Sequence, residues 1–253
     1  MKYYIIAGEA SGDLHGSNLM KGIYAEDPQA EIRFWGGDLM AGVQNTAHPG
    51  QSGLVRHYKD GAIMGFVEVM MKARKLLGNV KFCKNDILVW NPDVVILIDY
   101  PGFNFKIAEF AHKAGFKVFY YIAPKVWASR EGRIKKLKAY VDKLFIVFPF
   151  EKSYFEKKGI SYIYKGNPLV DAVDGSAAMS ESRTDFLTRN DLEDKPIIAM
   201  LAGSRKGEIG TMMPVLTEFA SKMHSTERYS DYQFLIAGAP SRTMNDYAPY
   251  KCN

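Results

Sequence analysis

The strongest constraint on the fold lies in the first 15 residues, where an apolar run breaks at a small-residue loop. The run from Tyr3 to Ala7 ends at Gly8, and a polar loop with Glu9 and Ser11 follows before a helical pattern begins. A strand that ends in such a loop and leads into a helix is typical of open α/β sheets, which bind ligands at the carboxyl ends of their strands. This segment therefore predicts both an α/β fold and a ligand-binding edge.

The same alternation of apolar runs and amphipathic stretches continues along the chain. We predict strands at 2–7, 31–35, 93–98, 117–122, 143–148, 161–164, 197–202 and 232–237, and helices at 13–25, 103–114, 130–140, 150–158 and 207–223. The apolar run 94–98 is continuous, as expected of a strand covered by helices on both faces. The pattern predicts parallel, doubly wound α/β sheets.

The alternation fails between 171 and 193, where the residues are small and polar, and restarts at Ile197. We predict two Rossmann-like domains, 1–168 and 169–253, with a linker within 168–190. The second domain has two clear strands, and two parallel strands cannot bury both faces of a sheet. We therefore expect the second domain to be incomplete in this chain.

The net charge of +5 comes from one short window, 125–138. Its six basic residues are Lys125, Arg130, Arg133, Lys135, Lys136 and Lys138, against one acid, Glu131. Such a window forms either a solvated helix face or a patch for anionic lipid or phosphate. No nucleic-acid recognition motif accompanies it, so we expect no nucleic-acid partner.

Other bulk features point to a cytoplasmic protein without a membrane span. No apolar run approaches the roughly 18 residues that cross a bilayer. The N-terminal run is too short for a signal peptide. Cys83 and Cys252 lie far apart in sequence and suit a reducing compartment.

Segment 62–71 is rich in large, flexible apolar residues and is followed by basic ones. It predicts either a buried helix with a basic end or an apolar surface for acyl chains or a membrane interface. In the second case the surface consists of Ile63, Met64, Phe66, Val67 and Met70.

Two polar motifs follow predicted strands directly. Asp99 follows the strand 93–98, so its carboxylate is expected to enter the ligand crevice. Burial there would raise the pKa of Asp99 and make it a stronger base. The alternatives are that Asp99 caps the following helix or is a buried structural residue. Gly203, Ser204 and Arg205 follow the strand 197–202 and lead into a helix, which predicts a diphosphate site or an ordinary cap at Ser204. Gly238 ends the next strand and either lines the same crevice or forms a turn.

The loop after the strand 117–122 carries aromatic and basic groups to the same edge, including Trp127 and Arg130. No metal-ligand spacing occurs among the five histidines, and we expect neither a metal nor a cofactor.

Six segments, in order, resemble the lipid-A-disaccharide synthases. They are Gly8-Glu9-Ala10-Ser11-Gly12-Asp13, Gly65-Phe66-Val67-Glu68-Val69, Asp99-Tyr100-Pro101-Gly102-Phe103-Asn104, Pro124-Lys125-Val126-Trp127-Ala128, Gly166-Asn167-Pro168-Leu169 and Leu201-Ala202-Gly203-Ser204-Arg205. Each motif alone is weak, and the ordered set is specific. This chain has Ala202 where the family commonly has proline, which leaves the glycine, serine and arginine in place.

The resemblance implies a glycosyltransferase-B fold with an acceptor-side first domain and a nucleotide-side second domain. It implies an inverting transfer that joins UDP-2,3-diacylglucosamine to 2,3-diacylglucosamine 1-phosphate, forming the β-1,6 lipid A disaccharide and UDP at the inner face of the inner membrane. The resemblance implies that Asp99 is the general base and that Arg205 contacts the UDP diphosphate. It also implies that the loop residues Glu9 and Ser11 are needed for activity. We expect Asp99 and Arg205 to meet across one cleft.

Two alternatives remain at this point. One is a soluble sugar enzyme similar to UDP-N-acetylglucosamine 2-epimerase, which needs no lipid-facing surface. The other is a non-catalytic fragment that binds membrane or lipid.

Overall fold

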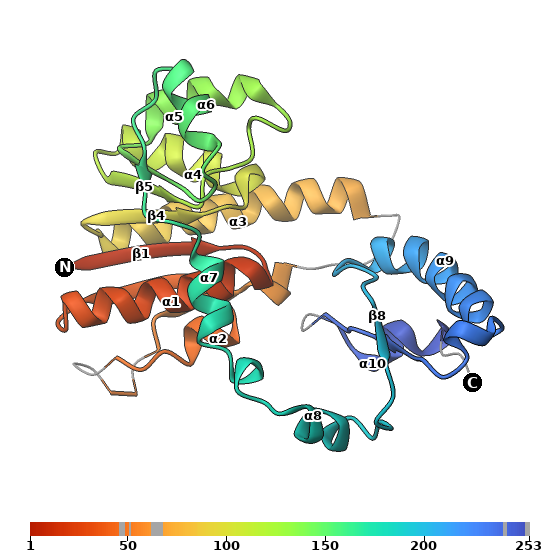
Figure 1. Cartoon of the computed structure of the whole chain (residues 1–253). Coiled ribbons are helices and arrows are strands. Elements are labelled where there is room, and N and C mark those ends of the chain that lie inside the picture. The colour runs from red at the N-terminus through yellow and green to blue at the C-terminus, as the bar shows by residue number, and fades with distance from the viewer. Residues whose placement is uncertain (46–48, 51, 62–67, 240–241, 251–253) are drawn as a thin grey trace. The chain divides into compact units, whose positions relative to one another are not determined.

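The computed structural model describes residues 1–45, 49–50, 52–61, 68–239 and 242–250, with only the backbone described at 61, 68–75 and 177. The chain forms two compact units, Met1–Gly175 and Ser176–Asn253 (Figure 1).

The first unit is built on a seven-stranded parallel sheet in the order β3-β2-β1-β4-β5-β6-β7. Its strands are β1 (Lys2–Ala7), β2 (Glu31–Gly36), β3 (Leu54–His57), β4 (Val94–Ile98), β5 (Lys117–Tyr121), β6 (Lys143–Ile146) and β7 (Ile163–Tyr164). Its α-helices are α1 (Ala10–Glu26), α2 (Asp38–Ala41), α3 (Glu68–Trp90), α4 (Pro101–Lys113), α5 (Ile134–Tyr140), α6 (Glu151–Lys157) and α7 (Pro168–Asp174).

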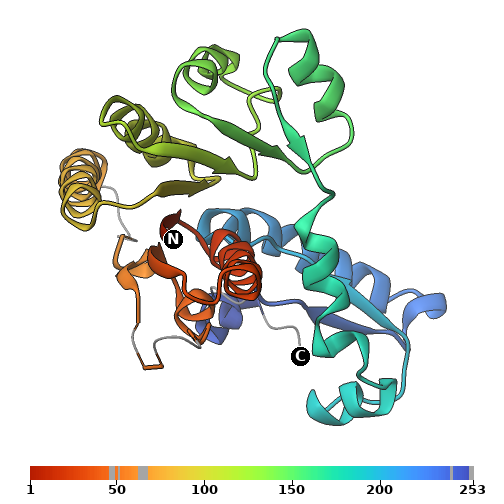
Figure 2. The same ribbon diagram turned by 90° about the vertical axis from the view of Figure 1, so that its left-hand side faces the viewer.

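Alternating side chains of the central strands fill two separate cores. Tyr4 and Ile6 of β1 pack with α3 and α4 on one face of the sheet. Ile5 and Ala7 pack with α1 and α2 on the other face. Because successive side chains of a strand point to opposite faces, a strand covered on both sides has to be apolar throughout. Helices lie on both sides of the strands (Figure 2), and the predicted doubly wound class is confirmed.

The second unit has a short parallel pair, β8 (Ile197–Met200) and β9 (Gln233–Ile236). Its α-helices are α8 (Arg183–Arg189), α9 (Lys206–His224) and α10 (Met244–Tyr247). Ala202, Ile209, Met213 and Tyr247 form its small core.

Several elements differ from the predictions. Strand β3 was not predicted, because four residues at a sheet edge give too short a pattern. The predicted linker contains two helices, α7 and α8; Asn167 caps the first by accepting a bond from the backbone amide of Leu169. Helix α7 packs against α1, and the boundary at 168/169 stays a prediction. None of the helices in the described ranges is long and apolar enough to span a bilayer.

A polar network ties α3 to the first two strands. The Asp86 carboxylate accepts bonds from Arg33 Nε at 2.9 Å, from Arg33 Nη2 at 2.6 Å and from the Tyr4 hydroxyl at 2.7 Å. The indole of Trp35 donates to the same hydroxyl at 3.0 Å. Burial raises the pKa of Asp86, but the bonds from Arg33 and Tyr4 and the charge of Arg33 outweigh burial and hold it below the ordinary value.

We expect Asp86→Asn to lower the free energy of unfolding at pH 7 by about 2 kcal/mol, because two charge-assisted bonds are lost. A lowered folded-state pKa stabilises the fold fully above the ordinary aspartate value of 3.8 and less as pH falls through the folded value. The difference in unfolding free energy between the wild type and Asp86→Asn should therefore shrink below pH 4.

Urea titrations at pH 7 and pH 3 measure this difference. The control is Glu109→Gln, which removes an exposed ion pair. A difference that is the same at both pH values contradicts this account.

Candidate functional site

The loops that follow β1 and β4 meet at the carboxyl edge of the sheet. The two strands are neighbours, with Ala7 opposite Ile98. A Cβ atom on Gly8 would lie 2.3 Å from the ring of Tyr100, so only glycine lets the two loops come this close. Burial and then the charge of Glu9 raise the pKa of Tyr100. The structure thus brings the predicted residues Glu9 and Asp99 onto neighbouring loops of one edge.

The turn that carries Asp99 is strained. Asp99 and Tyr100 have φ angles of 39° and 43°, in the left-handed region that costs a non-glycine residue about 1–2 kcal/mol. The carbonyl of Asp99 accepts bonds from Asn104 Nδ2 at 2.8 Å and from the Tyr120 hydroxyl at 2.7 Å. Asn104 is fully buried and also donates to the carbonyl of Ile98. Two buried donors therefore hold the turn, and such strain concentrates at functional sites.

Asp99 is not the cap of the following helix. Tyr100 takes that position, and Pro101 occupies the first turn of α4. The capping alternative is therefore wrong. Asp99 is half-buried at the end of the buried strand β4, and its charge contributes, after burial, to raising the pKa of Tyr120.

Glu9 and Ser11 lie at the start of α1, Glu9 in the cap position. Both side chains are exposed. A helix N-terminus at this edge presents backbone amides to an anionic group.

Asp13, in the same motif, has a structural role that the sequence analysis missed. Its carboxylate is 2 % exposed and accepts bonds from the backbone amides of Gly37 at 2.7 Å, Leu39 at 3.1 Å and Met40 at 3.0 Å. These amides belong to the first turn of α2. Asp13 therefore joins the first turn of α1 to the start of α2.

A small hollow of about 30 Å³ lies beside Gly8 and Tyr100. Arg56, His57 and Tyr58 line it, and all three come from β3 or the turn that follows. His57 Nε2 lies 3.3 Å from an Asp38 oxygen. Sequence reasoning missed these residues because it missed β3; the available signal was the apolar pair Leu54-Val55 after Gly53.

In the second unit, the loop after β8 and the start of α9 hold Gly203, Ser204 and Arg205. Arg205, not Ser204, is the cap residue of α9. The carboxylate of Glu208 accepts bonds from the Ser204 and Arg205 amides, each at 3.0 Å, and from Arg205 Nη1 at 2.9 Å. The bonds from the Arg205 and Ser204 amides and from the guanidinium lower the pKa of Glu208. The Glu208 carboxylate therefore accepts bonds from the same backbone amides, those of Ser204 and Arg205, that were predicted to bind an anion.

Gly203 and Gly238 lie in the loops that follow the neighbouring parallel strands β8 and β9. Gly203 has a φ of 89°, and a Cβ there would lie 2.7 Å from the Glu208 carboxylate. Arg242, after β9, donates from Nε to the carbonyl of Ser204 at 3.0 Å. The two loops therefore meet at one edge of the second sheet.

The predicted lipid surface is described only in part. Ile63, Met64, Phe66 and Val67 lie outside the described residues, and Met70 lies in α3 where only the backbone is described. The basic patch is described completely. Arg130, Lys135, Lys136 and Lys138 are exposed, while the guanidinium of Arg133 lies over the ring of Phe105 at 5.6 Å.

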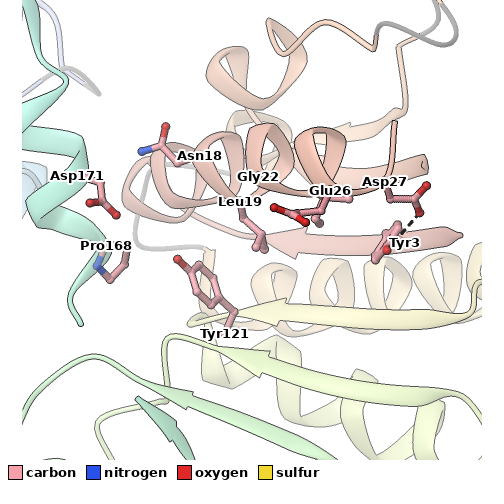
Figure 3. Close-up of a pocket in the computed structure, with 10 residues that line it drawn as sticks. Tyr3, Asn18, Leu19, Gly22, Glu26, Asp27, Tyr121, Pro168 and Asp171 are labelled. Atoms are coloured by element: carbon pink, nitrogen blue, oxygen red, sulfur yellow. Dashed lines mark hydrogen bonds between the residues drawn. The ribbon is translucent and has the colours of Figure 1, made fainter. Parts of the chain in front are cut away.

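A larger pocket of about 400 Å³ lies on the other face of the first unit, between α1, α7 and the end of β5 (Figure 3). Tyr121, Asn18 and Asp171 border it, and burial and the charge of Asp171 raise the pKa of Tyr121. None of the predicted catalytic residues lines this pocket.

The described residues include no cluster of three or more His, Cys, Asp or Glu side chains placed to hold a metal ion.

Comparison with known proteins decides the family. The family model for lipid-A-disaccharide synthetase matches residues 3–247. A lipid-A-disaccharide synthase from Geobacter metallireducens is 39 % identical over 248 residues, which cover 97 % of this chain. The chain belongs to the lipid-A-disaccharide synthetase family.

Another family member, from Syntrophus aciditrophicus, is 39 % identical over 232 residues, covering 92 % of this chain and 57 % of the relative. The match with the Geobacter relative covers 61 % of that protein. The chain thus spans about three-fifths of the length of these members of the family.

Solved structures share the fold at low identity. A UDP-GlcNAc 2-epimerase from Neisseria meningitidis, bound to UDP-GlcNAc, has a TM-score of 0.66 at 12 % identity and covers 95 % of this chain and 66 % of the epimerase. The MnaA protein of S. aureus with UDP has a TM-score of 0.67 at 15 % identity and covers 98 % of this chain and 65 % of MnaA. These likenesses show the fold alone, so the epimerase alternative is not favoured.

We expect Asp13→Ala to lower the free energy of unfolding by about 3 kcal/mol, because buried amides of α2 lose their acceptor. Asp38→Ala, with a side chain that is 78 % exposed, is the neighbouring control and should cost much less, because surface ion pairs contribute little. Chemical denaturation measures both, and amide exchange should quicken in α2 for Asp13→Ala. Equal losses in the two variants would contradict the structural role of Asp13.

Proposed function

We propose that the protein is an inverting glycosyltransferase that joins UDP-2,3-diacylglucosamine to 2,3-diacylglucosamine 1-phosphate. The products are the β-1,6 lipid A disaccharide 1-phosphate and UDP. Family membership supports the reaction, and one structural observation carries the assignment of its base: the strained, clamped turn that holds Asp99 at the end of the buried strand β4.

Asp99 acts as the general base in this proposal. Its carboxylate accepts the proton of the acceptor's 6-hydroxyl as that oxygen attacks the anomeric carbon of the donor sugar. The bond from that carbon to the diphosphate breaks, and UDP departs with the electron pair. Attack from the face opposite UDP inverts the configuration. A fixed base removes the cost of aligning a mobile carboxylate.

Glu9 and Ser11 lie on the neighbouring loop, next to Tyr100. We propose that they contact the acceptor at this edge. The exposed hydroxyl of Ser11 and the carboxylate of Glu9 are suited to sugar hydroxyl groups.

Arg205, with the backbone at Gly203, Ser204 and Gly238, binds the UDP diphosphate in this proposal. A guanidinium matches phosphate oxygens with paired donors and needs no metal ion to offset their charge. Glu208 accepts bonds from Arg205 and from the amides at the start of α9. A diphosphate therefore has to compete with this carboxylate.

The lipid parts of both substrates call for an apolar and basic surface. We propose that Ile63, Met64, Phe66, Val67 and Met70 contact acyl chains. Arg130, Arg133, Lys135, Lys136 and Lys138 then face the anionic leaflet or the acceptor phosphate. The protein would act at the cytoplasmic face of the inner membrane, with no nucleic-acid partner.

We expect Asp99→Asn and Arg205→Ala to fail in different ways in the full-length protein. Asp99→Asn removes the base, so transfer should fall by at least about 100-fold while UDP affinity holds. Arg205→Ala removes a charge-assisted contact, so UDP affinity should fall about tenfold or more. Mass spectrometry of the disaccharide product and calorimetry with UDP measure the two effects.

Each variant is the control for the other. Wild-type turnover in Asp99→Asn would remove Asp99 as the base, and unchanged UDP affinity in Arg205→Ala would remove the diphosphate contact. A full-length wild-type protein that makes no disaccharide from the two lipid substrates would contradict the proposed function.

We expect replacement of Lys135, Lys136 and Lys138 by glutamine to weaken binding to phosphatidylglycerol vesicles about 100-fold at low salt. Each lysine near an anionic surface contributes roughly 1 kcal/mol. Vesicle sedimentation over a range of salt concentrations measures the loss.

The matched control is a triple glutamine variant at the exposed Lys21, Lys143 and Lys222, which lie outside the patch. An equal loss in the control would show that net charge, not the patch, drives binding.

A further inference from the structure

Three aromatic side chains cluster after β5 and β6 in the first unit. The rings of Trp127 and Phe150 meet edge to face with centroids 4.9 Å apart. Phe148 and Phe150 are stacked with centroids 5.4 Å apart. Trp127 is 38 % exposed and Phe150 is 50 % exposed. Exposed aromatic clusters of this kind mark binding surfaces more often than isolated apolar side chains do.

A buried carboxylate, that of Glu151, holds this aromatic cluster in place. Glu151 is 0 % exposed, and it accepts a bond from the indole Nε1 of Trp127 at 3.0 Å. It also accepts bonds from the backbone amides of Val147 at 3.1 Å and Phe148 at 3.0 Å. These bonds join the loop after β5 to the loop after β6.

This arrangement fixes the ring of Trp127 without burying it. A buried carboxylate is costly unless donors satisfy it, and here three donors do. The exposed indole loses little conformational freedom when a ligand binds, because the bond to Glu151 already sets its orientation. The aromatic surface is therefore pre-organised, with the Trp127 and Phe150 rings at nearly a right angle.

The cluster lies on the same edge as Asp99. Strands β4, β5 and β6 are consecutive in the sheet and parallel, so the loops that carry Asp99, Trp127 and Phe150 all leave its carboxyl end. Neighbouring strands lie about 4.8 Å apart, so the loops that carry these residues leave adjacent positions along one edge of the sheet. Lys125 and Arg130 are exposed in the loop that carries Trp127, so this loop also carries positive charge.

We propose that the sugar ring of the phosphorylated acceptor stacks on one of the two nearly perpendicular rings of Trp127 and Phe150 and packs against the edge of the other; this pair of rings is called the platform. The apolar C–H face of a pyranose fits an exposed aromatic ring, and the 1-phosphate group fits the charges of Lys125 and Arg130. The platform orients the acceptor so that its free hydroxyl reaches the carboxylate of Asp99. This inference rests on the proposed function and adds the subsite that holds the acceptor ring.

The test compares Trp127→Phe with Trp127→Leu in the full-length protein. Neither phenylalanine nor leucine can donate to Glu151, so both variants lose that bond equally, and only phenylalanine keeps a ring. The probe is 2,3-diacylglucosamine 1-phosphate in detergent micelles, with affinity measured by calorimetry and the acceptor and donor KM values measured by product formation. We expect Trp127→Leu to weaken acceptor binding about tenfold and Trp127→Phe by less than about threefold. The donor KM should stay unchanged.

Phe150→Leu is the second variant, since it disturbs no hydrogen bond of Glu151, and it should weaken acceptor binding severalfold. Phe219→Leu replaces a similarly exposed aromatic ring, 44 % exposed in α9, and should have no effect. Equal affinities for Trp127→Phe and Trp127→Leu, at any level, would overturn the platform; so would an unchanged affinity in Phe150→Leu. A wild-type protein that neither binds nor converts the acceptor would contradict the proposed function as well, which separates the two failures.

Discussion

Burial of the central strand β4 on both faces is the constraint on which the candidate site depends. Val94 to Ile98 lie between β1 and β5, with side chains alternating between two cores. A strand enclosed in this way has no freedom to shift its register, because a slip of one residue would exchange its two sets of side chains. The residue that follows it, Asp99, is therefore fixed at the carboxyl edge by the whole sheet.

The rigid sheet allows local strain at its edge. Two consecutive non-glycine residues, Asp99 and Tyr100, adopt left-handed backbone angles, which a flexible loop would relax. Asn104 from α4 and Tyr120 from β5 hold the turn by donating to the carbonyl of Asp99. The stability of two packed elements thus offsets the cost of the turn, as expected where backbone geometry serves binding or catalysis.

Buried carboxylates connect the loops of this edge to one another. Asp13 joins the first turn of α1 to the start of α2, and Glu151 joins the loops after β5 and β6. Each accepts bonds from several donors, so its burial is compensated. Parallel strands have no direct turn between neighbours, and side chains that cross from loop to loop take over the task of aligning the edge.

The sequence by itself determined the α/β class, the buried strand β4 and the order of the motifs, because these depend on the local pattern of apolar and polar residues. It also located Glu9, Asp99 and Arg205 at strand ends. It did not reveal β3 with Arg56 and His57, since an edge strand of four residues carries almost no pattern. Only the tertiary structure decided which groups distant in sequence meet: Asp13 binds the amides of α2, and Glu151 holds the indole of Trp127. These long-range bonds depend on how the helices and loops pack against the sheet, and a linear pattern of residue types does not encode that packing.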